Sequence, residues 1–238
     1  MPSLLERYIS ADSLKSGYLT PAETAKVMRV ALKGRFPHTK FSVRTRGNSI
    51  DVSWIDGPRP KAVDRVVDQF TSGQFDGSID LAITHRSYLM PDLQSAIVAK
   101  SPGTTGSMGY IPPVDNPKPH PDAVLVRFGA KYVFARRHVS MNSLRSVLRQ
   151  VAAESNNQFD PEAVTIEQGP SEAWVASPWT TYRLEGGWHP DKYLTDAIWA
   201  VASALTFTAN GAIAKPLVVE PACEASDVPQ VLAGAENV

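Results

Sequence analysis

The sequence has a single cysteine, Cys223, which excludes an internal disulfide framework and a thiolate-bound metal cluster. It also lacks any apolar run of about 18 residues, so no membrane-spanning segment is expected. The first nine residues include Glu6 and Arg7 and have no apolar stretch typical of a signal peptide. With 43% apolar and 20% charged residues, the composition indicates a folded protein, which we expect to be cytoplasmic.

Motifs for catalysis and metal binding are scarce. None of the five histidines lies at metal-ligand spacing from another histidine or a carboxylate on one helix. The Gly-rich stretch 103–109 has the composition of a phosphate loop, but Pro112 follows where the required helix would begin. Asp64 and Asp68 could form the carboxylate pair of a metal-dependent nuclease, although the solvent-facing side of the helix is the preferred interpretation. The sequence therefore favours a non-enzymatic protein without cofactor or metal.

Charge of each sign is unevenly distributed along the chain. Residues 1–150 contain 21 Lys and Arg against 12 Asp and Glu, a net charge of +9. Residues 151–238 contain 3 against 12, a net charge of −9. Such asymmetry predicts a partner with a strong electric field, most simply nucleic acid, or an acid–base contact within or between chains.

The stretch from Thr20 to Phe75 predicts a helix, a tight hairpin and a second helix. Thr20 and Glu23 form a capping box around Pro21, and Gly34 is the expected end of the first helix. The second helix is predicted from an apolar stripe at Val63, Val66, Val67 and Phe70, with Gly73 at its end.

Between the two helices, Gly47-Asn48 predicts a two-residue hairpin turn. The resulting register pairs three sets of residues on the buried side: Thr45 with Ile50, Val43 with Val52, and Phe41 with Trp54. On the other side, Arg44 is expected to form an ion pair with Asp51. Both helices are predicted to cover the Phe41/Trp54 face, leaving the opposite face open.

Further elements are predicted up to residue 150. A third strand is expected at 79–84, followed by a long Pro-rich loop at 90–122 with a helical turn at 93–98. Alternating apolar residues predict a second hairpin at 124–134, turned at Gly129-Ala130 and buried on both faces. A helix capped by Ser140 or Asn142 should then bury Leu144, Val147, Leu148 and Val151.

The acidic C-terminal part should contain a turn and a short strand from Phe159 to Ile166, and Trp174, Trp179 and Trp188 should pack irregularly over the core. An apolar helix is predicted from Pro190 to Asn210-Gly211, buried on nearly all sides. The predicted organisation is a basic domain at 1–150, an acidic helical extension at 151–214 packed on it, and a flexible tail at 215–238. The fold class is α+β, with an antiparallel or mixed sheet covered by helices on one face.

A basic surface is the candidate site. Lys26, Arg29 and Lys33 lie at i, i+3 and i+7 on one helical face away from the apolar stripe, although a solvated helix side is the plain alternative. Arg44 is omitted because Asp51 should neutralise it. The predicted nucleic-acid-binding residues are Lys26, Arg29, Lys33, Arg35, Lys40, Arg46, Arg136, Arg137, Arg145 and Arg149.

Four segments carry a family resemblance: LTPAETAKVMRVALKGRFPHTKFSVRTRG from Leu19, SIDVSWIDGP from Ser49, QFTSGQFDGSID from Gln69 and GAKYVFARRHVS from Gly129. Together they make residues 18–141 similar to the large polyvalent protein-associated domain 29 family. The Pro-rich insertion at 90–122 departs from the family pattern.

The resemblance implies an accessory protein of a phage or conjugative plasmid, acting inside the host cell, and supplies no catalytic residues. We expect it to bind DNA or RNA through the basic surface. One alternative is a protein-binding inhibitor of a host defence complex, such as an anti-CRISPR or anti-restriction factor, and another is the metal-dependent nuclease. Homo-oligomerisation is left open.

Overall fold

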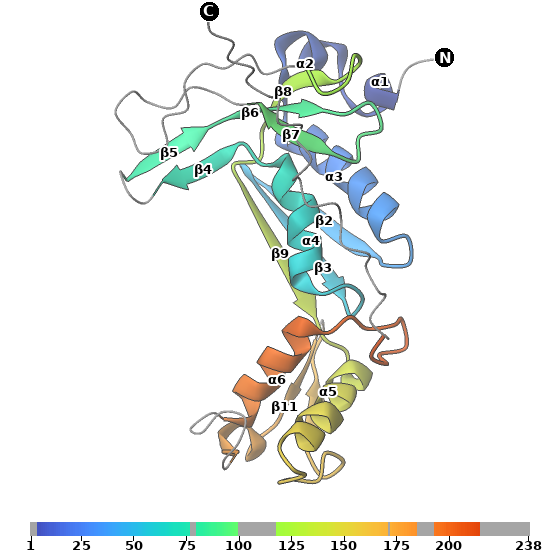
Figure 1. Ribbon diagram of the computed structural model, residues 1–238, viewed down its shortest axis with the longest axis vertical. Coiled ribbons are helices and arrows are strands. Elements are labelled where there is room, and N and C mark those ends of the chain that lie inside the picture. The colour runs from blue at the N-terminus through green and yellow to red at the C-terminus, as the bar shows by residue number, and fades with distance from the viewer. Residues whose placement is uncertain (1–3, 77–79, 100–117, 171, 185–192, 215–238) are drawn as a thin grey trace, which may run out of the picture.

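The computed structural model describes residues 4–76, 80–99, 118–170, 172–184 and 193–214 and shows an elongated molecule with two hydrophobic cores (Figure 1). The helices are α1 (Leu4–Tyr8), α2 (Ala11–Ser16), α3 (Pro21–Arg35), α4 (Pro60–Val67), η1 (Asp68–Phe70), α5 (Met141–Glu154), η2 (Trp179–Thr181) and α6 (Leu194–Ala204). The strands are β1 (Tyr18–Leu19), β2 (Phe41–Arg46), β3 (Ser49–Ile55), β4 (Gly73–Asp76), β5 (Leu81–Thr84), β6 (Arg86–Leu89), β7 (Ala96–Ala99), β8 (Val124–Phe128), β9 (Tyr132–His138), β10 (Ile166–Gln168) and β11 (Ala173–Val175). Helices beside mixed and antiparallel sheets confirm the α+β class.

The central sheet has the strand order β2-β3-β9. The β2–β3 hairpin has the predicted register, in which Phe41 pairs with Trp54, Val43 with Val52 and Thr45 with Ile50. Gly47 has a φ of +58°, as the turn requires of its first residue. Strand β9 runs parallel to β3, with Tyr132 opposite Ser49 and His138 opposite Ile55.

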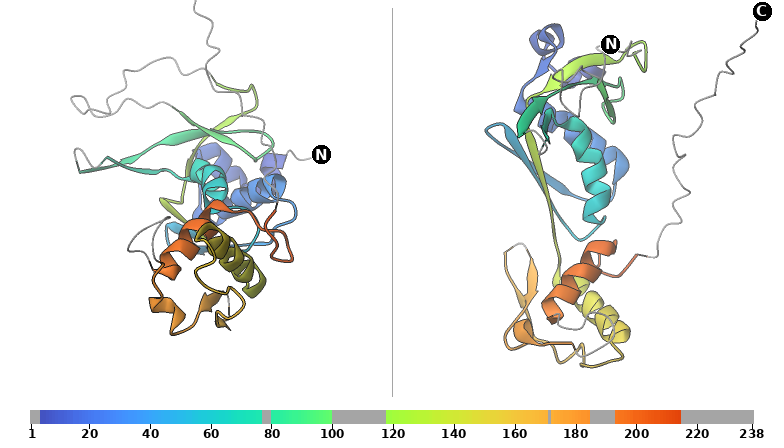
Figure 2. Two further views of the ribbon diagram at one scale, coloured as in Figure 1. Left: turned by 60° about the horizontal axis from the view of Figure 1, so that its bottom comes forward. Right: turned by 60° about the vertical axis from the view of Figure 1, so that its left-hand side comes forward.

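Helices α3 and α4 cover the side of the central sheet that carries Val43, Ile50, Val52 and Trp54 (Figure 2). The capping box of α3 is present: Thr20 Oγ1 accepts from the Glu23 amide, and a Glu23 carboxylate oxygen accepts from the Thr20 amide. However, α3 continues through Gly34 to Arg35, so the predicted glycine cap is wrong. The apolar stripe predicted for the second helix is buried in α4 and in the 3-10 segment η1, which forms its last turn. Gly73, the predicted end of this helix, is instead the first residue of β4.

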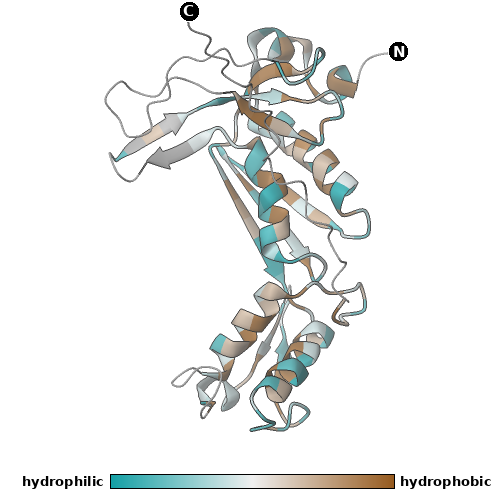
Figure 3. Ribbon diagram, viewed as in Figure 1, coloured by the Kyte–Doolittle hydropathy of each residue, from teal (hydrophilic) through white to brown (hydrophobic). Residues whose placement is uncertain are grey.

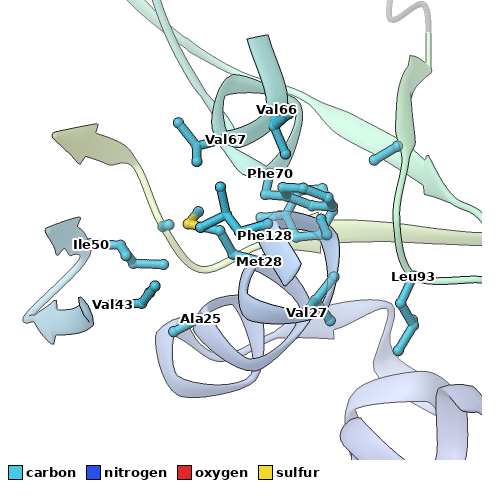
Figure 4. Packing of buried hydrophobic residues seen from close by; sticks show 14 of the residues in the cluster. Ala25, Val27, Met28, Val43, Ile50, Val66, Val67, Phe70, Leu93 and Phe128 are labelled. Carbon is cyan, nitrogen blue, oxygen red and sulfur yellow. The ribbon is translucent and has the colours of Figure 1, made fainter. Parts of the chain in front are cut away.

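The first core lies between these helices and the sheets (Figure 4). The rings of Phe70 and Phe128 meet edge to face with centroids 5.6 Å apart, an arrangement that aromatic quadrupoles favour. Val27 and Met28 of α3 pack beside them, and both are fully buried. This core ties α3, α4 and the strands on either side into one unit.

A second sheet has the order β1-β8-β6-β7, and it shows that the hairpin predicted at 124–134 is wrong. Strand β8 pairs with β1 and β6, whereas β9 joins the central sheet. The intervening Ala130 carbonyl accepts from the Ser72 amide at 3.0 Å, and the Lys131 amide donates to the Asn48 carbonyl at 2.7 Å. Gly129-Ala130 therefore connects two sheets instead of reversing the chain.

Two smaller predictions also need correction. The expected helical turn at 93–98 is a strand connection, because Leu93 has a φ of +59° and β7 begins at Ala96 to pair with β6. The predicted third strand is present as β5, but it pairs with β4 and stands apart from the central sheet. Most of the Pro-rich loop, together with Ile79, lies outside the described residues.

The second core contains α5, α6 and the β10–β11 hairpin. Ser140 caps α5, and the predicted stripe of Leu144, Val147, Leu148 and Val151 is buried. That stripe packs in the second core, which begins at Val139, so α5 belongs structurally with the C-terminal part. The predicted domain limits remain predictions, and the tail at 215–238 lies outside the described residues.

Helix α6 differs from its prediction in length and in burial. It starts at Leu194 and ends at Ala204, because the backbone of Leu205 is extended. Figure 3 shows it to be hydrophobic over most of its length, yet the Trp199 side chain is 65% exposed. No helix within the described ranges is long and apolar enough to cross a membrane.

Candidate nucleic-acid interface

The face of the central sheet opposite α3 and α4 is the candidate site, and we call it the open face. Because successive side chains along a strand point to opposite faces of the sheet, the side chains of the open face point away from the first core. It consists of Ser42, Arg44, Arg46, Ser49, Asp51, Ser53, Ile55, Tyr132, Phe134 and Arg136. Asp51 is the only acidic residue in the three strands, so the open face is cationic.

Three arginines of the open face are exposed: Arg44, Arg46 and Arg136. Arg44 lies opposite Asp51 as predicted, but the ion pair of Asp51 is the diagonal one, with Arg46 Nε 3.9 Å from Asp51 Oδ2. The prediction that Asp51 forms its ion pair with Arg44 is therefore wrong, and Arg44 joins the candidate residues of the open face. Because the Arg46 side chain is 86% exposed, this pair is solvent-screened and leaves its guanidinium accessible.

The predicted row on α3 lies along the edge of β2. Arg29 Nη2 donates to the Val43 carbonyl of β2 at 2.5 Å, which fixes the helix face beside this strand. Lys26 and Lys33 flank Arg29 at helical spacing and are exposed. Arg35 and Lys40 are also exposed, at the end of α3 and just before β2. The α3 row and the arginines of β2 thus lie on adjoining surfaces.

Arg137 does not belong to this surface, although it was predicted to bind nucleic acid. It follows Arg136 in a strand and so points to the opposite face, where it is only 6% exposed. Its guanidinium donates to the carbonyls of Leu205 and Ala202, and lies 4.9 Å from the Phe207 ring. Burial lowers the pKa of Arg137 to about 10, against the opposing effect of Asp56, so it stays charged at neutral pH.

Arg145 and Arg149 lie in the second core unit, away from the open face, and share an acidic partner. Arg149 Nε donates to Glu162 Oε1 at 2.7 Å, and Arg145 Nε lies 3.7 Å from Glu162 Oε2. Arg145 also donates to the carbonyls of Pro161 and Val164. Glu162 lies in the acidic half of the chain. Arg145 and Arg149 are therefore paired locally with an acidic residue and do not extend the open face.

An aromatic pair on the open face was missed from the sequence. Tyr132 and Phe134 were expected to be buried, but their side chains are 48% and 58% exposed. Their rings are inclined by 23°, with centroids 6.5 Å apart, and the Lys131 ammonium lies 5.3 Å from the Tyr132 centroid. Tyr132, Phe134 and Arg136 are two residues apart along β9 and so lie on the same face of the sheet. Their alternation with a charged residue was the one sequence signal for an exposed position.

In the proposed carboxylate pair, Asp64 is half-buried and Asp68 lies nearer to the solvent. Burial raises the pKa of Asp64, with a further contribution from Asp68, and burial raises that of Asp68. Within the part of the chain that the structure describes, no group of three or more His, Cys, Asp or Glu residues could hold a metal ion. The pair lies on α4 and η1, on the covered side of the sheet.

These features define an α+β domain with a cationic, partly aromatic sheet face. Residues 19–140 match the model of the large polyvalent protein associated domain 29 family, which is more than half of the chain. The chain belongs to this family, as the sequence segments indicated. The match ends at Ser140, the cap of α5, and so covers nearly all of the first core unit. No curated protein and no solved structure matches the chain.

Proposed function

We propose that this chain is a non-enzymatic accessory protein of a mobile genetic element that binds nucleic acid through the open face. The observation that carries the proposal is the exposed set Arg44, Arg46 and Arg136 around a single acidic residue, Asp51. Guanidinium groups make charge-assisted, often bidentate hydrogen bonds to phosphate oxygens. The adjoining α3 row extends the positive surface past the edge of β2.

Contacts of this kind depend strongly on ionic strength. Neutralising phosphates releases condensed counterions, and the logarithm of the affinity falls with the logarithm of salt concentration by about 0.7 per contact for single strands. Three arginines and Lys131 would give a slope of about −3 if each meets one phosphate. A gel shift or anisotropy titration that detects no DNA or RNA binding at low salt would overturn the proposal.

Neutralising Arg44 and Arg136 together is expected to weaken nucleic-acid binding by about tenfold or more, because two phosphate contacts are lost. The salt slope should become shallower by about 1.4. Fluorescence anisotropy of the double variant Arg44→Gln/Arg136→Gln, at several salt concentrations, measures both effects.

The matched control is Lys61→Gln/Arg65→Gln, which removes the same charge from exposed residues of α4. Since α4 covers the opposite side of the sheet, this variant should bind as the unaltered chain does. Equal losses in both double variants would mean that net charge, rather than the open face, determines binding.

The anti-defence alternative needs a protein partner instead of a polyanion. Its test is co-purification of the chain with host nuclease complexes after the sample is treated with nuclease. Association that survives this treatment, together with no binding of free DNA or RNA, would favour the alternative. Loss of the association on treatment would favour the nucleic-acid proposal.

A further inference from the structure

The Tyr132–Phe134 pair gives the open face a feature that phosphate binding does not need. The two residues alternate along β9, so both rings project from the same side of the sheet as Arg136. Between them, Val133 packs against the first core, as does the following Ala135. The backbone therefore holds the two rings outward, each about half exposed.

The rings lie at a spacing and inclination suited to planar ligands. Their centroids are 6.5 Å apart and their planes differ by 23°, so two nearly parallel π-faces are presented together. Across the sheet, Phe134 lies opposite Asp51 and Tyr132 opposite Ser49, both shorter side chains. Polar neighbours of this size leave the aromatic faces accessible from the solvent.

Cations surround this pair. Arg136 is the next residue on the same side of β9, and the Lys131 ammonium lies 5.3 Å from the Tyr132 ring centroid. Arg44 and Arg46 lie two strands away on the same face. A ligand that matches this surface has flat aromatic groups joined by a repeated negative charge, and single-stranded nucleic acid has both.

We infer that the open face binds single-stranded DNA or RNA, with bases stacked on Tyr132 and Phe134 and phosphates held by the surrounding cations. This inference rests on the proposed function and adds the strand class. In a duplex, the π-faces of internal bases are already stacked on their neighbours, whereas an unpaired strand can offer them to protein rings. Stacking tolerates any base, so little sequence preference is expected.

The test separates stacking from charge. The variant Tyr132→Ala/Phe134→Ala keeps every cation, and Tyr132→Phe/Phe134→Tyr keeps both rings. Each is titrated by fluorescence anisotropy against a labelled oligo(dT) strand and a labelled hairpin duplex with the same number of phosphates.

The alanine variant should bind oligo(dT) more weakly, by about 5- to 150-fold for each base that loses its stacking partner. Its salt slope and its weaker duplex binding should stay unchanged, because phosphate contacts remain. The ring-preserving variant should bind as the unaltered chain does. Circular dichroism melting of both variants verifies that the fold is retained.

Separate outcomes overturn separate claims. If Arg44→Gln/Arg136→Gln weakens binding but the alanine variant does not, the stacking inference is wrong and the proposed function stands. If the unaltered chain binds neither probe, the proposed function fails. If the alanine variant binds normally but lowers the oligomeric mass in sedimentation, the rings form a contact between copies of the chain, and the inference is again wrong.

Discussion

Replacing Arg137 by alanine is expected to lower the free energy of unfolding by about 3 to 5 kcal/mol. The guanidinium donates to the Leu205 carbonyl at 2.7 Å and to the Ala202 carbonyl, both at the end of α6. A cation at a helix C-terminus also interacts favourably with the helix dipole. Without it, the buried Ala202 carbonyl and the part-buried Leu205 carbonyl lose their charged partner, and the Phe207 ring loses a cation 4.9 Å away.

The adjacent arginine supplies the control. Arg136→Ala removes the same side chain from the exposed face and should change the free energy of unfolding by no more than about 0.5 kcal/mol. Urea unfolding followed by circular dichroism measures both variants. The two substitutions should also separate by function: Arg136→Ala weakens nucleic-acid binding, whereas Arg137→Ala mainly lowers stability. Equal stability of the two variants would contradict the assigned role of Arg137.

Arg137 matters because it joins the two parts of the molecule. It lies on β9 of the central sheet, and two of its hydrogen-bond acceptors, the carbonyls of Ala202 and Leu205, lie at the C-terminal end of α6. The same junction includes the Ser140 amide, which donates to Asp56 Oδ1 at 2.9 Å, and the Phe207 amide, which donates to the Gly57 carbonyl at 2.8 Å. The buried cation thus contributes to the orientation of α6 relative to the sheet that carries the open face.

Local signals predicted the β2–β3 hairpin well. A two-residue turn at Gly47-Asn48 determines the register, and the capping box at Thr20 and Glu23 determines where α3 begins. Both depend on residues close in sequence, so competing arrangements are few. The end of α3 was less predictable, because Gly34 is tolerated inside a helix as well as after it.

The position of β9 could not be derived in the same way. Its parallel pairing with β3 joins Ser49 to Tyr132 across more than half of the matched segment, and apolar residues on both faces of 124–134 suggested a buried hairpin. Arg136 and Arg137 lie on opposite faces of β9, so without the partner strand the alternation alone does not decide which face is covered. That uncertainty hid the exposure of Tyr132 and Phe134 and led Arg136 and Arg137 to be grouped together.

Charge counting had a related limitation. The +9 and −9 halves are real, but Glu162 lies close to Arg145 and Arg149, so part of the asymmetry is balanced between the end of the basic half and the acidic half. Formal charge along a sequence ignores such tertiary pairing. On the open face, by contrast, three exposed arginines have Asp51 as their one acidic neighbour within the three strands, so most of their charge stays unbalanced.

The other large effect is expected at Glu23, where substitution by glutamine should lower the free energy of unfolding by about 3 kcal/mol at neutral pH. The carboxylate is buried, with 7% exposure, and accepts hydrogen bonds from the Ser10 amide at 2.9 Å and the Ser13 hydroxyl at 2.8 Å. It also accepts from the Thr20 amide at 2.9 Å and hydroxyl at 2.7 Å. A glutamine has one acceptor oxygen and two donor hydrogens, so it cannot satisfy four donors.

The pH dependence gives this prediction an independent signature. Burial acts to raise the pKa of Glu23, but the hydrogen bonds from Ser10, Thr20 and Ser13 outweigh it and lower the pKa from 4.5 to about 2. Because the folded state holds its proton less tightly than the unfolded state, this stability is present above pH 4.5 and is lost as pH falls towards 2. Acid titrations of unfolding should therefore be steeper for the unaltered chain than for Glu23→Gln.

Asp12→Asn is the matched control, since Asp12 is an exposed carboxylate in the neighbouring α2. It should cost no more than about 0.5 kcal/mol and keep the acid dependence of the unaltered chain. If Glu23→Gln instead loses stability in parallel with the unaltered chain between pH 5 and pH 2, the carboxylate is not the group that titrates. A difference in pH slope confined to that range would show that one ionised side chain holds α2 against the start of α3, since its donors come from the N-terminal ends of both helices.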